Sequence, residues 1–118
     1  MQERHSFRLS LRIVFYREDD AWIAHCLETD VAGDGQTKRE ALDSLWDATV
    51  IQFEASPRWK NPANFFTPAP GRYFEMYALG ADVARADMDV SAERLTEVDG
   101  DLDEIAGRVY VDGGLAVV

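Results

Sequence analysis

Residues 33–46, GDGQTKREALDSLW, decide the fold of the first half of the chain, because they change from a glycine-rich turn into a helix-forming run. Thr37 and Glu40 form the T-x-x-E capping box of a helix N-terminus. In such a box the Thr37 hydroxyl accepts from the N–H of Glu40, and the Glu40 side chain accepts from the N–H of Thr37. Gly33 and Gly35 permit the backbone angles of a strand-to-helix turn. We therefore predict a helix that begins after Thr37.

The predicted helix has one apolar face and ends before a proline. Pro57 disfavours helical angles in the residue before it, so the helix is expected to end near Ala55 or Ser56. The sequence thus predicts one main helix over about residues 37–55. The residues that recur at three- and four-residue spacing and form its buried face are Leu42, Leu45, Trp46, Thr49, Val50 and Phe53.

Upstream of the turn the pattern has period two, which is typical of half-buried strands. Residues 7–16, FRLSLRIVFY, alternate in this way, and residues 22–27, WIAHCL, follow after an acidic turn at residues 18–20. An antiparallel hairpin is the simplest interpretation. Residues 28–36 have room for a short third strand that ends in the glycines. Residues 7–55 are therefore predicted to form a β-β-β-α unit with an antiparallel sheet, within an α+β fold.

The second half, residues 72–118, is predicted to be a β-rich extension of the same single domain. Residues 73–79, YFEMYAL, are rich in aromatic residues and predict a strand. An Asp-Gly pair at residues 112–113 lies between two β-prone runs, which is a strong hairpin signal. The pattern leaves the fold of residues 80–107 open.

The composition is that of one soluble domain. The chain has 118 residues and a single cysteine, Cys26, so it has no intrachain disulfide, which fits a reducing compartment. The N-terminus lacks the apolar stretch of a secretory signal, and no apolar run approaches the ~20 residues of a membrane span. We expect a cytoplasmic protein without a cofactor.

Acidic charge is concentrated in the second half of the chain. Residues 75–104 hold ten acidic residues against two basic ones, and so carry -8 of the formal net charge of -10. Such a surface is either simply solvated or selects a partner of opposite charge. It repels a nucleic-acid backbone, so we expect no DNA binding. The candidate partner-binding residues are Asp99, Asp101, Asp103 and Glu104.

No arrangement typical of catalysis stands out. His25 and Cys26 are neighbours on a predicted strand, so their side chains point to opposite faces and cannot form a nucleophile–base pair. Asp99, Asp101 and Asp103 match positions one, three and five of a calcium loop, but Glu104 stands where glycine is required. We expect no enzyme activity and no metal site. A metal-dependent nuclease built on scattered acidic residues stays open as an alternative.

A combination of short motifs resembles the N-terminal domain of HicB-like antitoxins over about residues 8–54. These motifs are an aromatic residue after an acidic turn, a strand ending in C-x-E, a glycine before a threonine, and an E-A-L helix. The family's basic DNA-binding segment has no counterpart here. The residues that carry the resemblance are Trp22, Ala24, Cys26, Leu27, Glu28, Gly35, Thr37, Glu40, Ala41 and Leu42.

The resemblance implies a non-enzymatic interaction protein. Its partner would be a small basic ribonuclease toxin of the HicA kind, held inactive by the β-β-β-α unit. The alternative is a stand-alone HicB-like protein that binds a second copy of itself. That alternative rests on the first predicted strand, which has apolar Val14 and Tyr16 on the same face as Arg8 and Arg12.

Overall fold

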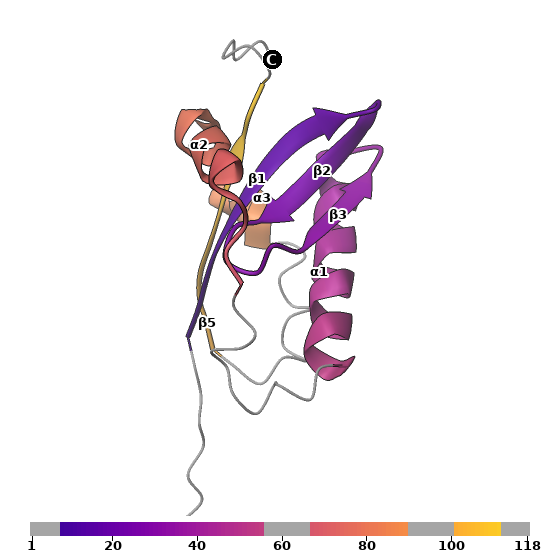
Figure 1. The fold of residues 1–118 in the computed structure, drawn as a ribbon, viewed down its shortest axis with the longest axis vertical. Helices are drawn as coiled ribbons and strands as arrows, with labels where there is room; N and C mark the ends of the chain where they lie inside the picture. Colours follow the sequence, from indigo (N-terminus) through magenta and orange to yellow (C-terminus); the bar gives the residue numbers. More distant parts are fainter. Residues whose placement is uncertain (1–7, 56–66, 90–100, 112–118) are drawn as a thin grey trace, which may run out of the picture.

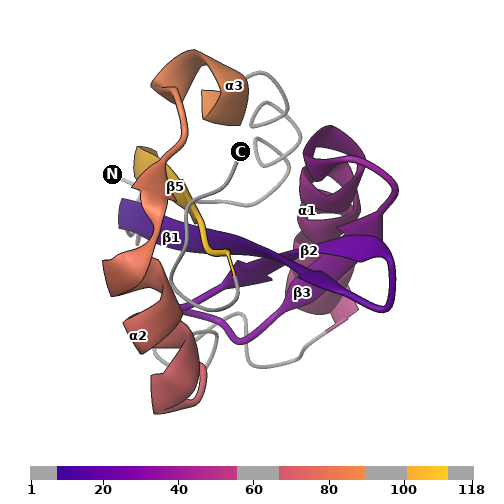
Figure 2. The same cartoon turned by 90° about the horizontal axis from the view of Figure 1, so that it is seen from above.

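A five-stranded sheet forms the centre of the molecule, with helices on both faces (Figures 1 and 2). The structure is a computed structural model that describes residues 8–55, 67–89 and 101–111. The elements in chain order are β1 (Arg8–Glu18), β2 (Ala21–Cys26), β3 (Ala32–Gly35), α1 (Lys38–Ala55), α2 (Gly71–Leu79), β4 (Ala81–Asp82), α3 (Arg85–Asp89) and β5 (Asp101–Val109).

The sheet has the strand order β3-β2-β1-β5-β4 and is mixed. β1 pairs antiparallel with β2, and β2 with β3, as the sequence predicts. β5, however, lies parallel to β1, so the prediction of a purely antiparallel sheet is wrong. Parallel neighbours need a long crossover connection, and the chain between β1 and β5, which includes α1, α2 and α3, supplies it.

The β1–β2 hairpin is closed by the predicted acidic turn. Glu18 pairs with Ala21, which leaves Asp19 and Asp20 as a two-residue loop. Both have positive φ, 53° and 66°, as the hairpin turns that match strand twist require. Aspartate tolerates this left-handed region better than most residues, which explains the Asp-Asp pair.

The N-terminus of α1 is capped largely as predicted. Thr37 Oγ1 accepts a hydrogen bond from the N–H of Glu40 at 3.0 Å. The return bond differs by one residue, because Glu40 Oε1 accepts from the N–H of Gln36 at 2.9 Å and not from Thr37. The buried face of α1 includes Leu42, Leu45, Trp46 and Thr49, with Val50 partly buried, as predicted, and also Ala41.

Residues 71–79 form helix α2, so the predicted strand at residues 73–79 is wrong. Aromatic residues favour strands by propensity, but here their spacing is helical. Tyr73, Phe74 and Tyr77 are partly buried against the sheet, whereas Glu75 and Leu79 are exposed. The backbone N–H of Gly80 closes the helix by bonding to the Tyr77 carbonyl oxygen at 3.1 Å.

In the described part of residues 72–118, helices accompany the strands, so this half is mixed and not mainly β. Residues 80–107 contain β4, α3 and most of β5. The Asp-Gly hairpin at residues 112–113 lies outside the described residues.

Two apolar layers hold the fold together. One joins β1 and β2 to α1 and α3, with Phe15, Trp46 and Met88 among its buried members. The other lies beneath α2, where Val14 and Leu27 are fully buried. β1 is therefore covered on both faces, which explains why its second face carries the apolar Val14 and Tyr16.

Candidate functional site

The structure describes the predicted acidic site only in part. Asp99 lies outside the described residues, and Asp101 and Glu104 belong to β5, where their backbones pair with Arg8 and Ser10 of β1. Asp103 lies at the register shift between these two pairs. The role of these four residues as a partner surface stays a prediction.

The family-motif residues gather where β2, β3 and α1 meet, and their contacts are structural. Cys26, Ala41 and Leu42 are buried in the core. Burial raises the pKa of the Cys26 thiol above its ordinary value of 9.0, which disfavours the reactive thiolate. Trp22 lies between two cations, with the Arg17 guanidinium 5.3 Å and the Lys38 ammonium 5.4 Å from its ring centroid.

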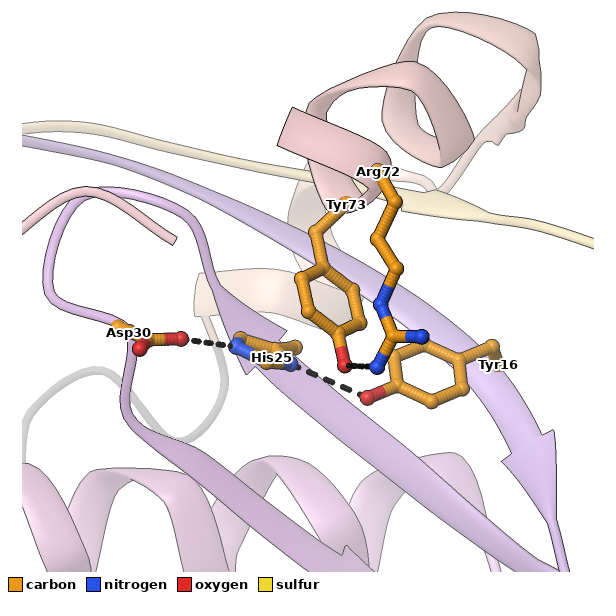
Figure 3. Close-up of polar contacts among 5 residues, drawn as sticks. All are labelled: Tyr16, His25, Asp30, Arg72 and Tyr73. Carbon is orange, nitrogen blue, oxygen red and sulfur yellow. Dashed lines mark hydrogen bonds and ion pairs between the residues drawn. The ribbon is translucent and has the colours of Figure 1, made fainter. Parts of the chain in front are cut away.

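A polar cluster between the sheet and α2 was not predicted as a site (Figure 3). His25, only 7% exposed, lies 2.8 Å from Asp30 Oδ1 through its Nε2, and 3.1 Å from the Tyr16 hydroxyl through its Nδ1. The Tyr73 ring covers the imidazole, with centroids 4.0 Å apart, and Arg72 donates a hydrogen bond to the Tyr73 hydroxyl. The cluster thus ties α2 to β1, β2 and the β2–β3 connection.

The polar groups of this cluster pair with one another. Both nitrogens of His25 have partners, Asp30 at Nε2 and Tyr16 at Nδ1. Burial, and then the neighbouring Tyr73, raise the pKa of Tyr16 above its ordinary value of 10.0. The Tyr16 phenol therefore stays protonated and acts as a hydrogen-bonding group.

The register of the hairpin contained a signal for this cluster. A two-residue loop at residues 19–20 places Val14 opposite His25 and makes Tyr16 a diagonal neighbour of His25 on the same face. The turn length and the alternation together predict that the side chains of Tyr16 and His25 are neighbours. The sequence pattern does not predict the contact between His25 and Tyr73, because it predicts a strand at residues 73–79.

A second set of contacts under α2 surrounds Arg12. Its Nε lies 2.7 Å from Glu28 Oε2, and its backbone N–H donates to Glu28 Oε1 at 2.7 Å. The guanidinium carbon is 5.1 Å from the Phe74 ring centroid and 6.0 Å from that of Tyr77. Arg12 is thus engaged with Glu28 and with the aromatic face of α2.

The outer edge of β3 is one of the two edges of the described sheet. Among the described strands, β3 is terminal and pairs only with β2. The N–H of Cys26 bonds to Val31 and that of Leu27 to Arg12, so even-numbered residues of β2 face β3. By the alternation of an antiparallel ladder, Gly33 and Gly35 bond toward β2, whereas the N–H and C=O groups of residues 32 and 34 point outward.

The two faces beside this edge differ in chemistry. On one face, glycines bring β3 directly onto α1: a Cβ at Gly33 would lie 2.2 Å from the backbone nitrogen of Leu45. Ser44, Ala48 and Ile51 continue along that flank of α1 at helical spacing, and Ile51 is 64% exposed. On the other face, Asp34 is exposed beside Ile23.

A pocket of about 220 Å³ lies on the opposite flank of α1. Phe15, Leu42, Val83 and Met88 line its apolar part, and Lys38, Arg39 and Asp87 supply charge. In residues 8–55, 67–89 and 101–111, no group of three or more His, Cys, Asp or Glu side chains is placed to hold a metal ion. No helix in that part of the chain is long and apolar enough to cross a bilayer.

Comparisons of the chain with protein-family models, with curated proteins and with solved structures find no match. The function is therefore argued from the site itself.

Proposed function

We propose that this chain is a non-enzymatic protein-binding module, similar in role to the HicB antitoxins, that holds a small basic protein of the HicA ribonuclease kind. The proposal rests above all on the open outer edge of β3, which offers unpaired backbone groups to a partner. The cytoplasmic location expected from the sequence belongs to the same proposal.

Charge supports a basic partner. Residues 28–47, which include β3 and the first half of α1, hold six acidic residues against two basic ones. The acidic run at residues 75–104 is a separate excess of negative charge in the sequence. Charge of one sign raises the association rate and the selectivity for partners of the opposite sign, and both effects weaken as salt rises.

The polar cluster at His25 also fits a binding role better than a catalytic one. Its residues form hydrogen bonds with one another and with Tyr73 of α2, so they stabilise the surface formed by the sheet and α2. A binding module needs such rigid support more than it needs a reactive group.

Capture from native cells tests the proposal. The tagged full chain is incubated with cell extract at low salt, and co-purifying proteins are identified by intact mass. We expect a small basic protein in stoichiometric amount that salt releases. Recovery of the chain alone, or of self-oligomers by light scattering across micromolar concentrations, would contradict the proposal.

Charge reversal then tests whether the predicted acidic residues contribute to partner binding. Replacing Asp99, Asp101 and Asp103 with lysine should weaken binding of the captured protein and flatten its salt dependence. Unchanged affinity would remove these residues from the partner surface. We also expect the chain to show no nuclease activity when magnesium or manganese is present.

A further inference from the structure

We infer that the β3 edge takes up an extended segment of the basic partner as a sixth strand of the sheet, and that this segment alternates basic and apolar residues. The inference rests on the proposed function and names the surface that performs it. Strand addition of this kind draws affinity from main-chain hydrogen bonds and specificity from alternate side chains.

Backbone groups of β3 point away from the sheet at its outer edge. Among the described strands β3 has a partner on one side only, and the register directs the N–H and C=O of Ala32 and Asp34 away from β2. Both residues are exposed, as expected of an uncovered edge. Two outward residues in a four-residue strand offer up to four backbone hydrogen bonds to an added strand.

The two faces that an added strand would meet differ in chemistry. On the α1 side it would run beside Ser44, Ala48 and Ile51, which form an uncharged and mostly apolar flank. From Ser44 to Ile51 the helix rises about 10 Å, which equals about three residues of strand. Apolar side chains of the added strand would cover Ile51, which is now exposed.

On the other face the added strand would meet the carboxylate of Asp34. Side chains on a strand alternate between faces, so every second residue of the added segment would lie on this acidic side. Lysine or arginine at these positions complements Asp34, and apolar residues at the others complement the α1 flank. The two faces therefore select a segment with a basic–apolar period of two.

A second copy of this chain fits the edge poorly. Pairing of β3 with β3 of another molecule would bring two acidic edges together, because Asp34 lies in the middle of the strand and the chain carries a net charge of -10. Like charges directly opposite one another destabilise strand pairs. The basic segment of a different protein is the occupant that the charges favour.

Binding of a synthetic probe to the full chain tests the inference. The probe is a ten-residue peptide that alternates lysine and valine, and a glutamate–valine peptide of equal length is its control. We expect the lysine–valine peptide to bind and the glutamate–valine peptide not to bind. Equal binding of both peptides, or of neither, would overturn the inference.

Two variants with the same change of net charge separate the edge from general charge attraction. Asp34→Lys should weaken binding of the lysine–valine peptide by about three- to tenfold, and Glu75→Lys, on exposed α2, by less than about twofold. Equal effects of the two variants would show attraction to net charge alone and overturn the inference.

Ala32→Pro tests the backbone contribution without changing charge. Proline removes an N–H that points outward, so the β2–β3 ladder keeps its bonds. We expect Ala32→Pro to weaken binding of the lysine–valine peptide by at least about fivefold. If circular dichroism shows that this variant is unfolded, the result for Asp34→Lys decides whether the β3 edge is the binding surface. Self-association of the unaltered chain that Ala32→Pro abolishes would assign the edge to a second copy and overturn the inference.

The same variants distinguish failure of the inference from failure of the proposed function. If the captured basic protein binds Asp34→Lys and Ala32→Pro as tightly as the unaltered chain, the β3 edge is not its binding surface, and the proposed function stands. If the peptide discriminates among the variants but no basic protein is captured, the edge is supported and the proposed function fails.

Discussion

Gly33 lies so close to Leu45 that a Cβ on the glycine would be 2.2 Å from the leucine backbone nitrogen. No real side chain is accommodated at that distance, and the obstacle is helix backbone that cannot rotate away. The contact places β3 against the first half of α1 (Figure 1), and no strand among the described residues pairs with its outer edge. The position of the proposed docking edge therefore depends on this glycine.

Gly33→Ala should destabilise the protein by about 1–3 kcal/mol, the usual cost of overpacking, or more if β3 is displaced. Urea unfolding followed by circular dichroism measures this. Gly71→Ala is the matched control, because a Cβ at Gly71 meets no atom within 4 Å. It should leave stability unchanged or raise it slightly. Equal costs for the two variants would contradict the packing described.

Thr37→Ala removes the hydroxyl that caps α1. Because the N–H of Glu40 then loses its acceptor, we expect a loss of about 1 kcal/mol in the free energy of unfolding. Glu40→Gln, which keeps an oxygen for the N–H of Gln36, should cost less than half as much. A larger loss for Glu40→Gln than for Thr37→Ala would argue against the capping geometry.

Tyr16→Phe tests the polar cluster that holds α2. It deletes the hydroxyl bonded to His25 Nδ1 and leaves that nitrogen buried without its partner, which should cost about 1–3 kcal/mol. Limited proteolysis should show faster cleavage at α2. Tyr73→Phe keeps the ring over His25 and removes a hydroxyl that bonds to exposed Arg72, so it should cost less stability than Tyr16→Phe. The reverse ranking of these two variants would contradict the cluster.

Stability should fall in alkaline solution. Burial raises the pKa of Tyr16 and Tyr77 above 10.0 and that of Cys26 above 9.0. The folded protein then holds protons that the unfolded chain releases first. The contribution of these groups is therefore complete below about pH 9 and is lost as pH rises from there toward the folded pKa values.

Urea midpoints measured between roughly pH 8 and 11 should show this decline, with a shallower slope for Tyr16→Phe. A midpoint that stays constant or rises over that range would contradict the burial of the three groups. Near neutral pH, substitution of these groups should not change how stability varies with pH.

Local patterns predicted the first half of the chain because short-range rules suffice there. The acidic turn, the hairpin, the glycines before α1 and its capping threonine all act within a few residues. Even so, one capping bond goes to Gln36 in place of Thr37, a difference that depends on the local chain path. The period of the α1 face predicted its buried residues because only one side of the helix packs on the sheet.

The second half depended on long-range pairing, which the sequence pattern does not contain. β5 pairs with β1 across more than eighty residues, and its parallel direction follows from the intervening helices. Residues 73–79 satisfy both a strand propensity and a helical spacing, and only packing on the second face of the sheet decides between them. A sheet edge is a surface that the sequence suggests for a basic partner, but the pattern does not identify β3 as that edge, because the position of a strand in the sheet depends on long-range pairing.

Amide hydrogen exchange of the full chain, alone and with saturating lysine–valine peptide, tests the central claim most directly. The amides of Ala32 and Asp34 point outward in the free protein, so strand addition should slow their exchange by at least about tenfold. Those of Gly33 and Gly35 already bond toward β2 and should change little. Unchanged exchange at Ala32 and Asp34 in the bound state would contradict the claim that β3 receives the basic partner.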